Sequence, residues 1–180
     1  GVGGGVIMNG KIVAGNRGLG GELGHITVNC DESEKCNCGN KGCLEQYASA
    51  TGVVKIAKRL LAERYSDSMI RNVEHLSAKK IFDAAKKKDG IAVEAVETLA
   101  NYLGMAMATV TLTIDPDVFV IGGGVSNAGE ILVNTIEHYY KKYLSISEKR
   151  AKIVLASLGN DAGIYGAARM VLDQEVVEEE

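Results

Sequence analysis

The residues best suited to chemistry in this chain lie close together in one glycine-rich segment. One histidine, three cysteines and two glutamates share it: Glu22, His25, Cys36, Cys38, Cys43 and Glu45. Thiolates and imidazole are the ligands that zinc prefers, and four of them in a tetrahedral arrangement form a closed structural site. The spacing Cys-x-Cys followed by Gly-x-x-Gly-Cys places three thiolates on a tight turn, where they can reach one ion. The sequence therefore predicts a structural zinc knuckle.

Two residues could supply the fourth ligand of this site, His25 and Cys30. If residues 24–30 form an extended strand, side chains alternate between its faces, so that His25 lies opposite Ile26, Val28 and Cys30. The face with Cys30 is apolar and is typical of a core. We therefore predict His25 as the ligand and Cys30 as a buried thiol. Free or disulfide-bonded cysteines are the alternative.

Two carboxylates are tethered to the same predicted metal site. Glu22 precedes His25 by three residues, and Glu45 follows Cys43 by two. A metal-bound imidazole keeps an N–H in a fixed direction on its second ring nitrogen. Two acceptors beside such a donor suit the vicinal hydroxyls of a sugar, where each charged hydrogen bond contributes roughly 1.5–3 kcal/mol. The alternatives are a helix-start carboxylate for Glu45 and a solvated loop residue for Glu22.

Bulk properties limit the kinds of partner this chain can have. A length of 180 residues is typical of one domain, and the net charge of −3 leaves no broad basic face for nucleic acid. No apolar run is long enough to span a bilayer, and the first residues do not show the basic stretch, apolar segment and small-residue cleavage site of a secretion signal. All four cysteines lie between Cys30 and Cys43, which favours a metal site in a reducing compartment. We expect a cytoplasmic protein that binds neither membranes nor nucleic acid.

Helices and strands that could position the site follow from residue patterns. The expected elements are a hairpin at 6–13 around Asn9-Gly10, a strand at 25–28, one or two helices within 44–65, a helix after the N-cap Ser77 that stops near 89–90, a helix at 93–113, a strand at 118–121, a helix at 128–143, a strand at 152–156 and a helix ending near residue 172. The last two strands read as doubly buried because their apolar runs are continuous. This order predicts an α/β fold with a mixed sheet and helices on both faces.

The two ends of the chain have distinct character. The first residues open within a glycine turn that feeds an apolar strand, which predicts a fragment whose N-terminal part is absent. Residues 175–180 read as a frayed acidic tail.

The ordered motifs resemble the ROK family, named for repressors, open reading frames and sugar kinases. The resembling segments are 3–7 with Gly10, 21–25, 36–49, 121–125 and 159–167, so the resemblance covers nearly the whole chain. It implies an actin-like, ribonuclease H-type fold of two lobes with ATP and sugar bound between them. Residues 1–174 would then form the C-terminal lobe, and the family suggests a homodimer to which the helix at 93–113 contributes.

The resemblance also implies roles for individual residues. Zinc would be held by His25, Cys36, Cys38 and Cys43, and the hexose hydroxyls by Glu22, His25 and Glu45. The glycines that match the phosphate-facing hairpin and the nucleotide-side turn are Gly3, Gly4, Gly5, Gly122, Gly123 and Gly124. Without a side chain, such turns let backbone N–H groups approach phosphate closely. Apart from the resemblance, triple glycines are more often plain turn residues.

The resemblance further implies an activity for the parent protein. It indicates an ATP- and Mg²⁺-dependent hexokinase of glucokinase type, with fructose or N-acetylmannosamine kinases as close alternatives. In this family the base is the aspartate of an Asn-Asp pair in the N-terminal lobe. Asn160-Asp161 lies after the last strand and is not assigned that role, so we expect the chain alone to be inactive. A sugar-responsive repressor and a zinc-stabilised module without a sugar site are the competing hypotheses.

Overall fold

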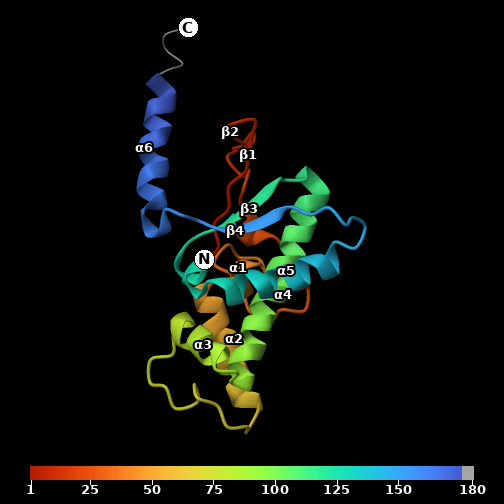
Figure 1. Cartoon of the computed structure of the whole chain (residues 1–180), viewed down its shortest axis with the longest axis vertical. Coiled ribbons are helices and arrows are strands. Elements are labelled where there is room, and N and C mark those ends of the chain that lie inside the picture. Colours follow the sequence, from red (N-terminus) through yellow and green to blue (C-terminus); the bar gives the residue numbers. More distant parts are fainter. Residues whose placement is uncertain (176–180) are drawn as a thin grey trace.

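A computed structural model describes residues 1–175 of the chain as an α/β arrangement (Figure 1). The elements in order are β1 (Ile7–Met8), β2 (Lys11–Ile12), a 3₁₀ helix (Leu23–His25), α1 (Glu45–Ala48), α2 (Ala50–Glu63), α3 (Ala78–Lys86), α4 (Gly90–Ile114), β3 (Val118–Ile121), a 3₁₀ helix (Gly124–Ala128), α5 (Glu130–Tyr143), β4 (Lys152–Leu155), a 3₁₀ helix (Gly159–Asp161) and α6 (Ala162–Glu175). The predicted acidic tail lies outside the described residues beyond its first residue. No helix among the described residues is long and apolar enough to cross a membrane.

The predicted hairpin near the N-terminus is confirmed. Ile7 pairs with Ile12 and Met8 with Lys11 in an antiparallel ladder. The turn residue Asn9 has φ 52° and the following glycine φ 77°, as a two-residue turn with two positive φ angles requires. The hairpin projects from the helical body (Figure 1).

Helix α4 is the centre of the core and confirms the long helix expected at 93–113. Asp89 caps its start by accepting a hydrogen bond from Ala92 N at 2.9 Å. At Gly104 a Cβ would lie 2.7 Å from Tyr140 N, so only glycine lets α5 approach this closely. The buried Thr111 and Tyr140 hydroxyls are hydrogen-bonded at 2.8 Å. These contacts pack α4 closely against α5.

Two serines set where two of the helices begin. Ser77 accepts a hydrogen bond from Lys80 N, which confirms it as the N-cap of α3. Ser49 is extended and accepts from Gly52 N at 2.9 Å. It therefore divides the helical stretch expected within 44–65 into α1, which carries Glu45, and α2.

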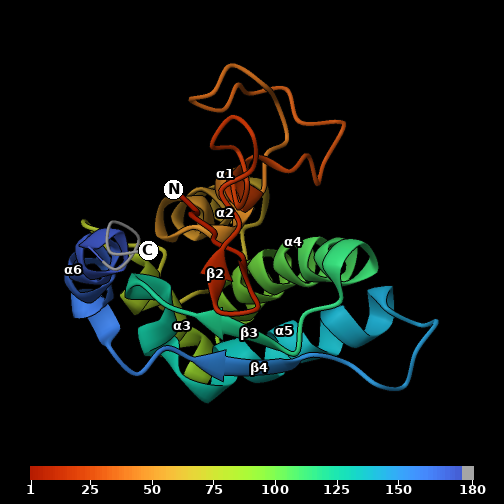
Figure 2. The same cartoon turned by 90° about the horizontal axis from the view of Figure 1, so that it is seen from above.

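The predicted mixed sheet with helices on both faces is wrong for the described chain. β3 and β4 form a parallel pair that is separate from the β1–β2 hairpin. Figure 2 shows the two strands lying side by side over α5. Phe119 packs edge-on against Tyr140 of α5 at 5.8 Å, whereas Val118 and Val120 on the opposite face are exposed. A continuous apolar run indicates double burial only where both faces are covered, and within these residues helices cover one face.

Helix α6 confirms the helix expected at the end of the chain and lies apart from the helical body (Figure 1). Ile164 and Tyr165 near its start are 72% and 60% exposed. The helix therefore contributes an apolar surface that nothing in the described chain covers.

Candidate functional site

The four predicted metal ligands lie together in the structure. One ligand atom from each of His25, Cys36, Cys38 and Cys43 falls within 4.8 Å of all the others. Cys36 Sγ lies 3.9 Å from His25 Nδ1, and Cys38 Sγ lies 3.6 Å from Cys43 Sγ. Ligands of a tetrahedral zinc ion are separated by roughly 3.3–3.8 Å, given its usual bond lengths. The donor set and its spacing therefore fit a closed zinc site.

Cys30 lies outside this cluster and is exposed, so the predicted buried thiol is wrong. The strand expected at 25–28 is wrong as well, because a 3₁₀ helix ends at His25 and only Thr27 forms an isolated bridge, with Cys43. Beyond the bridge, Asn29 Oδ1 accepts from Asp31 N and turns the chain. The cluster includes His25, but strand alternation is not the reason.

Close backbone approaches explain the glycines in these motifs. Gly24 packs against the N-terminal segment, where a Cβ would lie 1.9 Å from Val2 O. Gly42 has φ +72°, and a Cβ there would lie 1.7 Å from Asn29 O. Its carbonyl accepts hydrogen bonds from Val28 N and Asn29 N. The glycines thus let three segments meet around the cysteines.

The thiol turn is held by its own backbone and by helix α1. Cys36 N donates to Asn40 O at 2.7 Å, which closes the turn. Gln46 of α1 accepts from Cys43 N and donates to Glu34 O, both at 3.0 Å. One side chain therefore ties both ends of the cysteine loop to the helix that carries Glu45.

The three residues predicted to bind a hexose lie together, with the two glutamates on either side of the His25 imidazole. His25 Nε2 lies 3.8 Å from Glu22 Oε2, and His25 Nδ1 lies 3.7 Å from Glu45 Oε1. The Cys36 thiol donates to Glu45 Oε1 at 2.7 Å. The Glu22 side chain is 58% exposed and that of Glu45 is 15% exposed. The group therefore offers two acceptors and a ring nitrogen at the edge of the four-residue His–Cys cluster.

The electrostatic setting of the cluster is uneven. The thiol of Cys36 and the charge of His25 hold the pKa of Glu45 below its usual value, against the opposing effect of burial. Burial and the neighbouring thiols raise the pKa of Cys43 to about 12. A backbone hydrogen bond lowers the pKa of Cys38. Because zinc binds thiolates, loading of this site is coupled to proton release.

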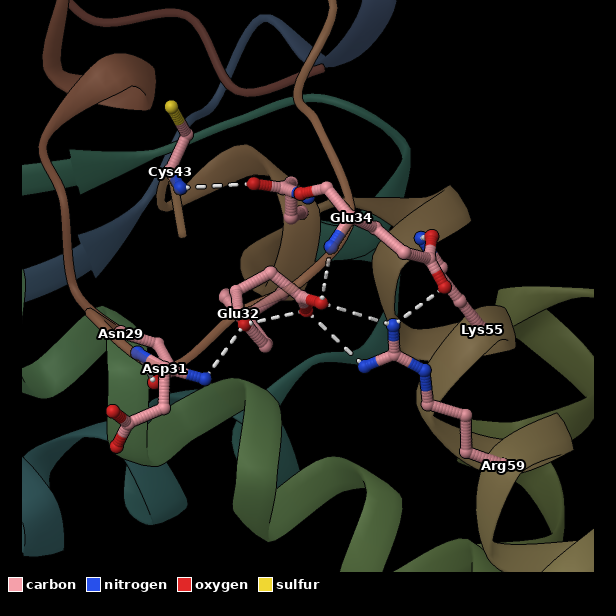
Figure 3. A network of polar contacts seen from close by, with 9 residues as sticks. Asn29, Asp31, Glu32, Glu34, Cys43, Lys55 and Arg59 are labelled. Carbon is pink, nitrogen blue, oxygen red and sulfur yellow. Dashed lines mark hydrogen bonds and ion pairs between the residues drawn. The ribbon is translucent and has the colours of Figure 1, made fainter. Parts of the chain in front are cut away.

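An ionic network that was not predicted from the sequence, centred on the buried Glu32, braces the loop before the cysteines (Figure 3). Glu32, which is only 7% exposed, accepts from Tyr47 Oη at 2.7 Å and from both terminal nitrogens of Arg59. Burial alone would raise the pKa of Glu32, but these hydrogen bonds lower it to about 2. Two basic residues four positions apart on α2, Lys55 and Arg59, were the available signal.

A cleft of about 890 Å³ is lined by both glycine segments that are predicted to bind the nucleotide. Residues 3–5 and 122–124 line it together with Met107 and Val110 of α4. Gly123 has φ +78°. A smaller cavity of about 250 Å³ is lined by Cys36 and Glu45, and Gly1 borders both spaces. The cleft and the Glu22–His25–Glu45 group are thus neighbours along the N-terminal segment.

Comparison with known proteins places this arrangement in a class. The fold is that of the actin-like sugar kinases: it matches the ROK family glucokinase from Streptomyces griseus, solved in complex with glucose and AMPPNP. The TM-score is 0.84, with 34% identity over 93% of this chain and 56% of that chain. The ROK family sequence profile matches residues 1–174. The chain belongs to the ROK family.

Individual relatives include both enzymes and regulators. A glucokinase from Halalkalibacterium halodurans is 41% identical over 97% of this chain and 54% of its own length. A ROK family transcriptional regulator, a homologue of the E. coli MLC protein, has a TM-score of 0.73 and 33% identity, over 86% of this chain and 39% of that chain. The chain spans about half the length of the curated relatives it matches.

Proposed function

We propose that this chain is the C-terminal, sugar- and nucleotide-binding lobe of an ATP-dependent hexose kinase that acts on glucose. The observation that carries the proposal is the arrangement of Glu22 and Glu45 on either side of His25, beside a four-ligand cluster. Two carboxylates and an oriented imidazole match the donors and acceptors of neighbouring sugar hydroxyls. The glucokinase relatives support glucose as the hexose.

In this proposal the chain's residues bind and orient the substrates. Zinc held by His25 and the three clustered cysteines would supply rigidity, because its four positions are filled by protein. Glu22 and Glu45 accept hydrogen bonds from the sugar, and the second nitrogen of His25 donates one. Backbone N–H groups along residues 3–5 and 122–124, which line the cleft, would bind ATP, and Mg²⁺ would neutralise its phosphates. Catalysis then rests on positioning.

The assignment as a lobe has two supports. The chain covers 54% of the Halalkalibacterium glucokinase. Large apolar side chains are exposed on the hairpin, on β3 and on α6: Ile12, Val120 and Ile164. A second lobe that packed there would remove this surface from water. The aspartate base is expected in that second lobe; the cytoplasmic location and the homodimer stay predictions.

A sugar-responsive repressor is the second candidate, favoured by the match to the ROK family transcriptional regulator. In that case the same residues would bind the sugar as an effector, and no phosphoryl group would be transferred. Kinases for fructose or N-acetylmannosamine would differ only in the hexose bound.

The test uses the zinc-loaded full-length protein, titrated calorimetrically with glucose, fructose and N-acetylmannosamine and assayed for ATP turnover. We expect glucose binding and turnover, and a Kd raised about 10–100-fold by Glu45→Ala, since one charged hydrogen bond is lost. The exposed Glu74→Ala serves as the matched control. Binding without turnover would indicate a repressor. If the zinc-loaded protein binds no hexose, the remaining hypothesis is a zinc-stabilised module without a sugar site.

A further inference from the structure

We infer that Glu32 and Arg59 are positioning residues for the sugar site, which set the place of α1 and therefore of Glu45. The inference rests on the proposed function and names a determinant of sugar affinity that does not touch the sugar.

The loop before the cysteines holds α1 through a tyrosine. Tyr47 lies two residues after Glu45 in the single-turn helix α1. Its hydroxyl donates to Glu32 Oε2 at 2.7 Å and accepts from Asn29 Nδ2 at 2.8 Å. A helix of one turn is not stable by itself. The position of Glu45 therefore depends on side chains that hold α1 from outside.

Helix α2 holds the same loop from the other side. Arg59 Nη1 and Nη2 donate to the two oxygens of Glu32 at 3.2 and 3.3 Å, and Nη2 also donates to Glu34 Oε1 at 2.8 Å (Figure 3). Lys55, one turn earlier on α2, pairs with Glu34 as well. A planar guanidinium that contacts both oxygens of a carboxylate fixes direction as well as distance.

All the acceptor capacity of Glu32 is used inside the protein. Oε1 accepts from Glu34 N and Arg59, and Oε2 accepts from Tyr47 and Arg59. A carboxylate offers about four lone-pair sites. Because all are taken and the side chain is buried, Glu32 has nothing left to offer a ligand. Its role is to connect α1, the loop and α2.

A comparable ion pair elsewhere provides the matched control. Arg64, just after α2, contacts both oxygens of Glu94 on α4. The Arg64 side chain is 51% exposed, and this ion pair includes no residue of the loop that carries Glu32 and the cysteines. Exposed pairs of this kind contribute little to stability. Substitution of Arg64 thus removes the same chemistry without touching α1.

The experiment compares Arg59→Met, Arg59→Lys, Tyr47→Phe and Arg64→Met in the zinc-loaded full-length protein. We expect Arg59→Met and Tyr47→Phe to raise the Kd and the KM for glucose about tenfold, as loss of an outer support of a site commonly does. The kcat at saturating glucose should stay within about twofold, because the lost interaction is equal in ground and transition states. Arg59→Lys should recover part of the affinity, and Arg64→Met should match the wild type.

Amide hydrogen exchange of residues 45–48 gives a readout that needs no sugar. Exchange there should be faster in Arg59→Met and Tyr47→Phe and unchanged in Arg64→Met. If Arg59→Met does not fold, Tyr47→Phe decides, since it leaves the contacts between Arg59 and Glu32 in place.

A lowered melting temperature with unchanged Kd, KM and exchange at 45–48 would overturn the inference and leave the network a merely structural role. A wild-type protein that binds zinc and no hexose would overturn the proposed function instead. In that case the exchange data still decide whether Arg59 positions α1.

Discussion

His25 Nδ1 lies 3.7 Å from Glu45 Oε1 and 3.9 Å from Cys36 Sγ, while Nε2 of the same ring faces Glu22 at 3.8 Å. One ring nitrogen therefore faces both the thiol cluster and Glu45, and the other ring nitrogen faces Glu22. The candidate metal site and the proposed sugar site share this residue, so perturbation of one is expected to reach the other.

Substitution of His25 and of Cys30 should show which of the two is the fourth zinc ligand. His25→Ala should lose bound zinc, because it removes a member of the four-ligand cluster, whereas Cys30→Ser should keep one zinc per chain, because Cys30 is exposed outside it. Elemental analysis of the purified variants measures this. The reverse pattern would make Cys30 the ligand.

Gly42→Ala should disrupt the cysteine loop far more than Gly39→Ala. Both glycines have positive φ, so both alanines carry backbone strain of about 1–2 kcal/mol. Only at position 42 would the new Cβ meet another atom, Asn29 O at 1.7 Å. Zinc affinity and melting temperature should therefore fall clearly for Gly42→Ala and modestly for Gly39→Ala. Equal effects would contradict the close approach.

Acid should remove the stabilisation that Glu32 provides. Its pKa is lowered from 4.5 to about 2 in the folded state, so the folded protein holds fewer protons than the unfolded chain between these values. The stabilisation is complete above about pH 4.5 and is lost as the pH falls towards 2, by roughly 3 kcal/mol in all.

Urea unfolding of the wild type and Glu32→Gln at pH 7 and near pH 2.5 tests this dependence. The difference in the free energy of unfolding should shrink at the lower pH. Glu74→Gln, at an exposed position, should show no such trend. A constant difference for Glu32→Gln would mean that its charge is not involved.

The 180-residue chain alone should not phosphorylate glucose, because the proposal places the base in another lobe. A coupled assay with ATP, Mg²⁺ and glucose measures this, with the full-length protein as the positive control. Turnover by the chain alone would require a base within it, and Asp161 would then be the first residue to substitute.

Local signals in the sequence were reliable where neighbours in the chain decide the conformation. Asn9-Gly10 adopts positive φ angles in the turn, and Ser77 caps α3 through an amide three residues away. The cysteine spacing predicted a cluster that the structure brings together within 4.8 Å. In each case the decisive contact lies within a few residues or follows from a glycine-enforced turn.

Expectations failed where a distant segment decides. Residues 25–28 form one isolated bridge, Thr27 opposite Cys43, and no strand, and Cys30 is exposed. The continuous apolar run of β3 predicted burial on both faces, but in the described chain helices cover only one face of the strand.

The sequence by itself determined the helices, the hairpin, the cluster of cysteines and the family resemblance, because periodicity, caps and motif spacing are local properties. Only the tertiary structure decided which sheet face is covered and that Glu32 meets Arg59, 27 residues away on α2. A buried carboxylate needs partners, but local pattern does not say which helix supplies them. That choice depends on how α1, α2 and the cysteine loop pack together.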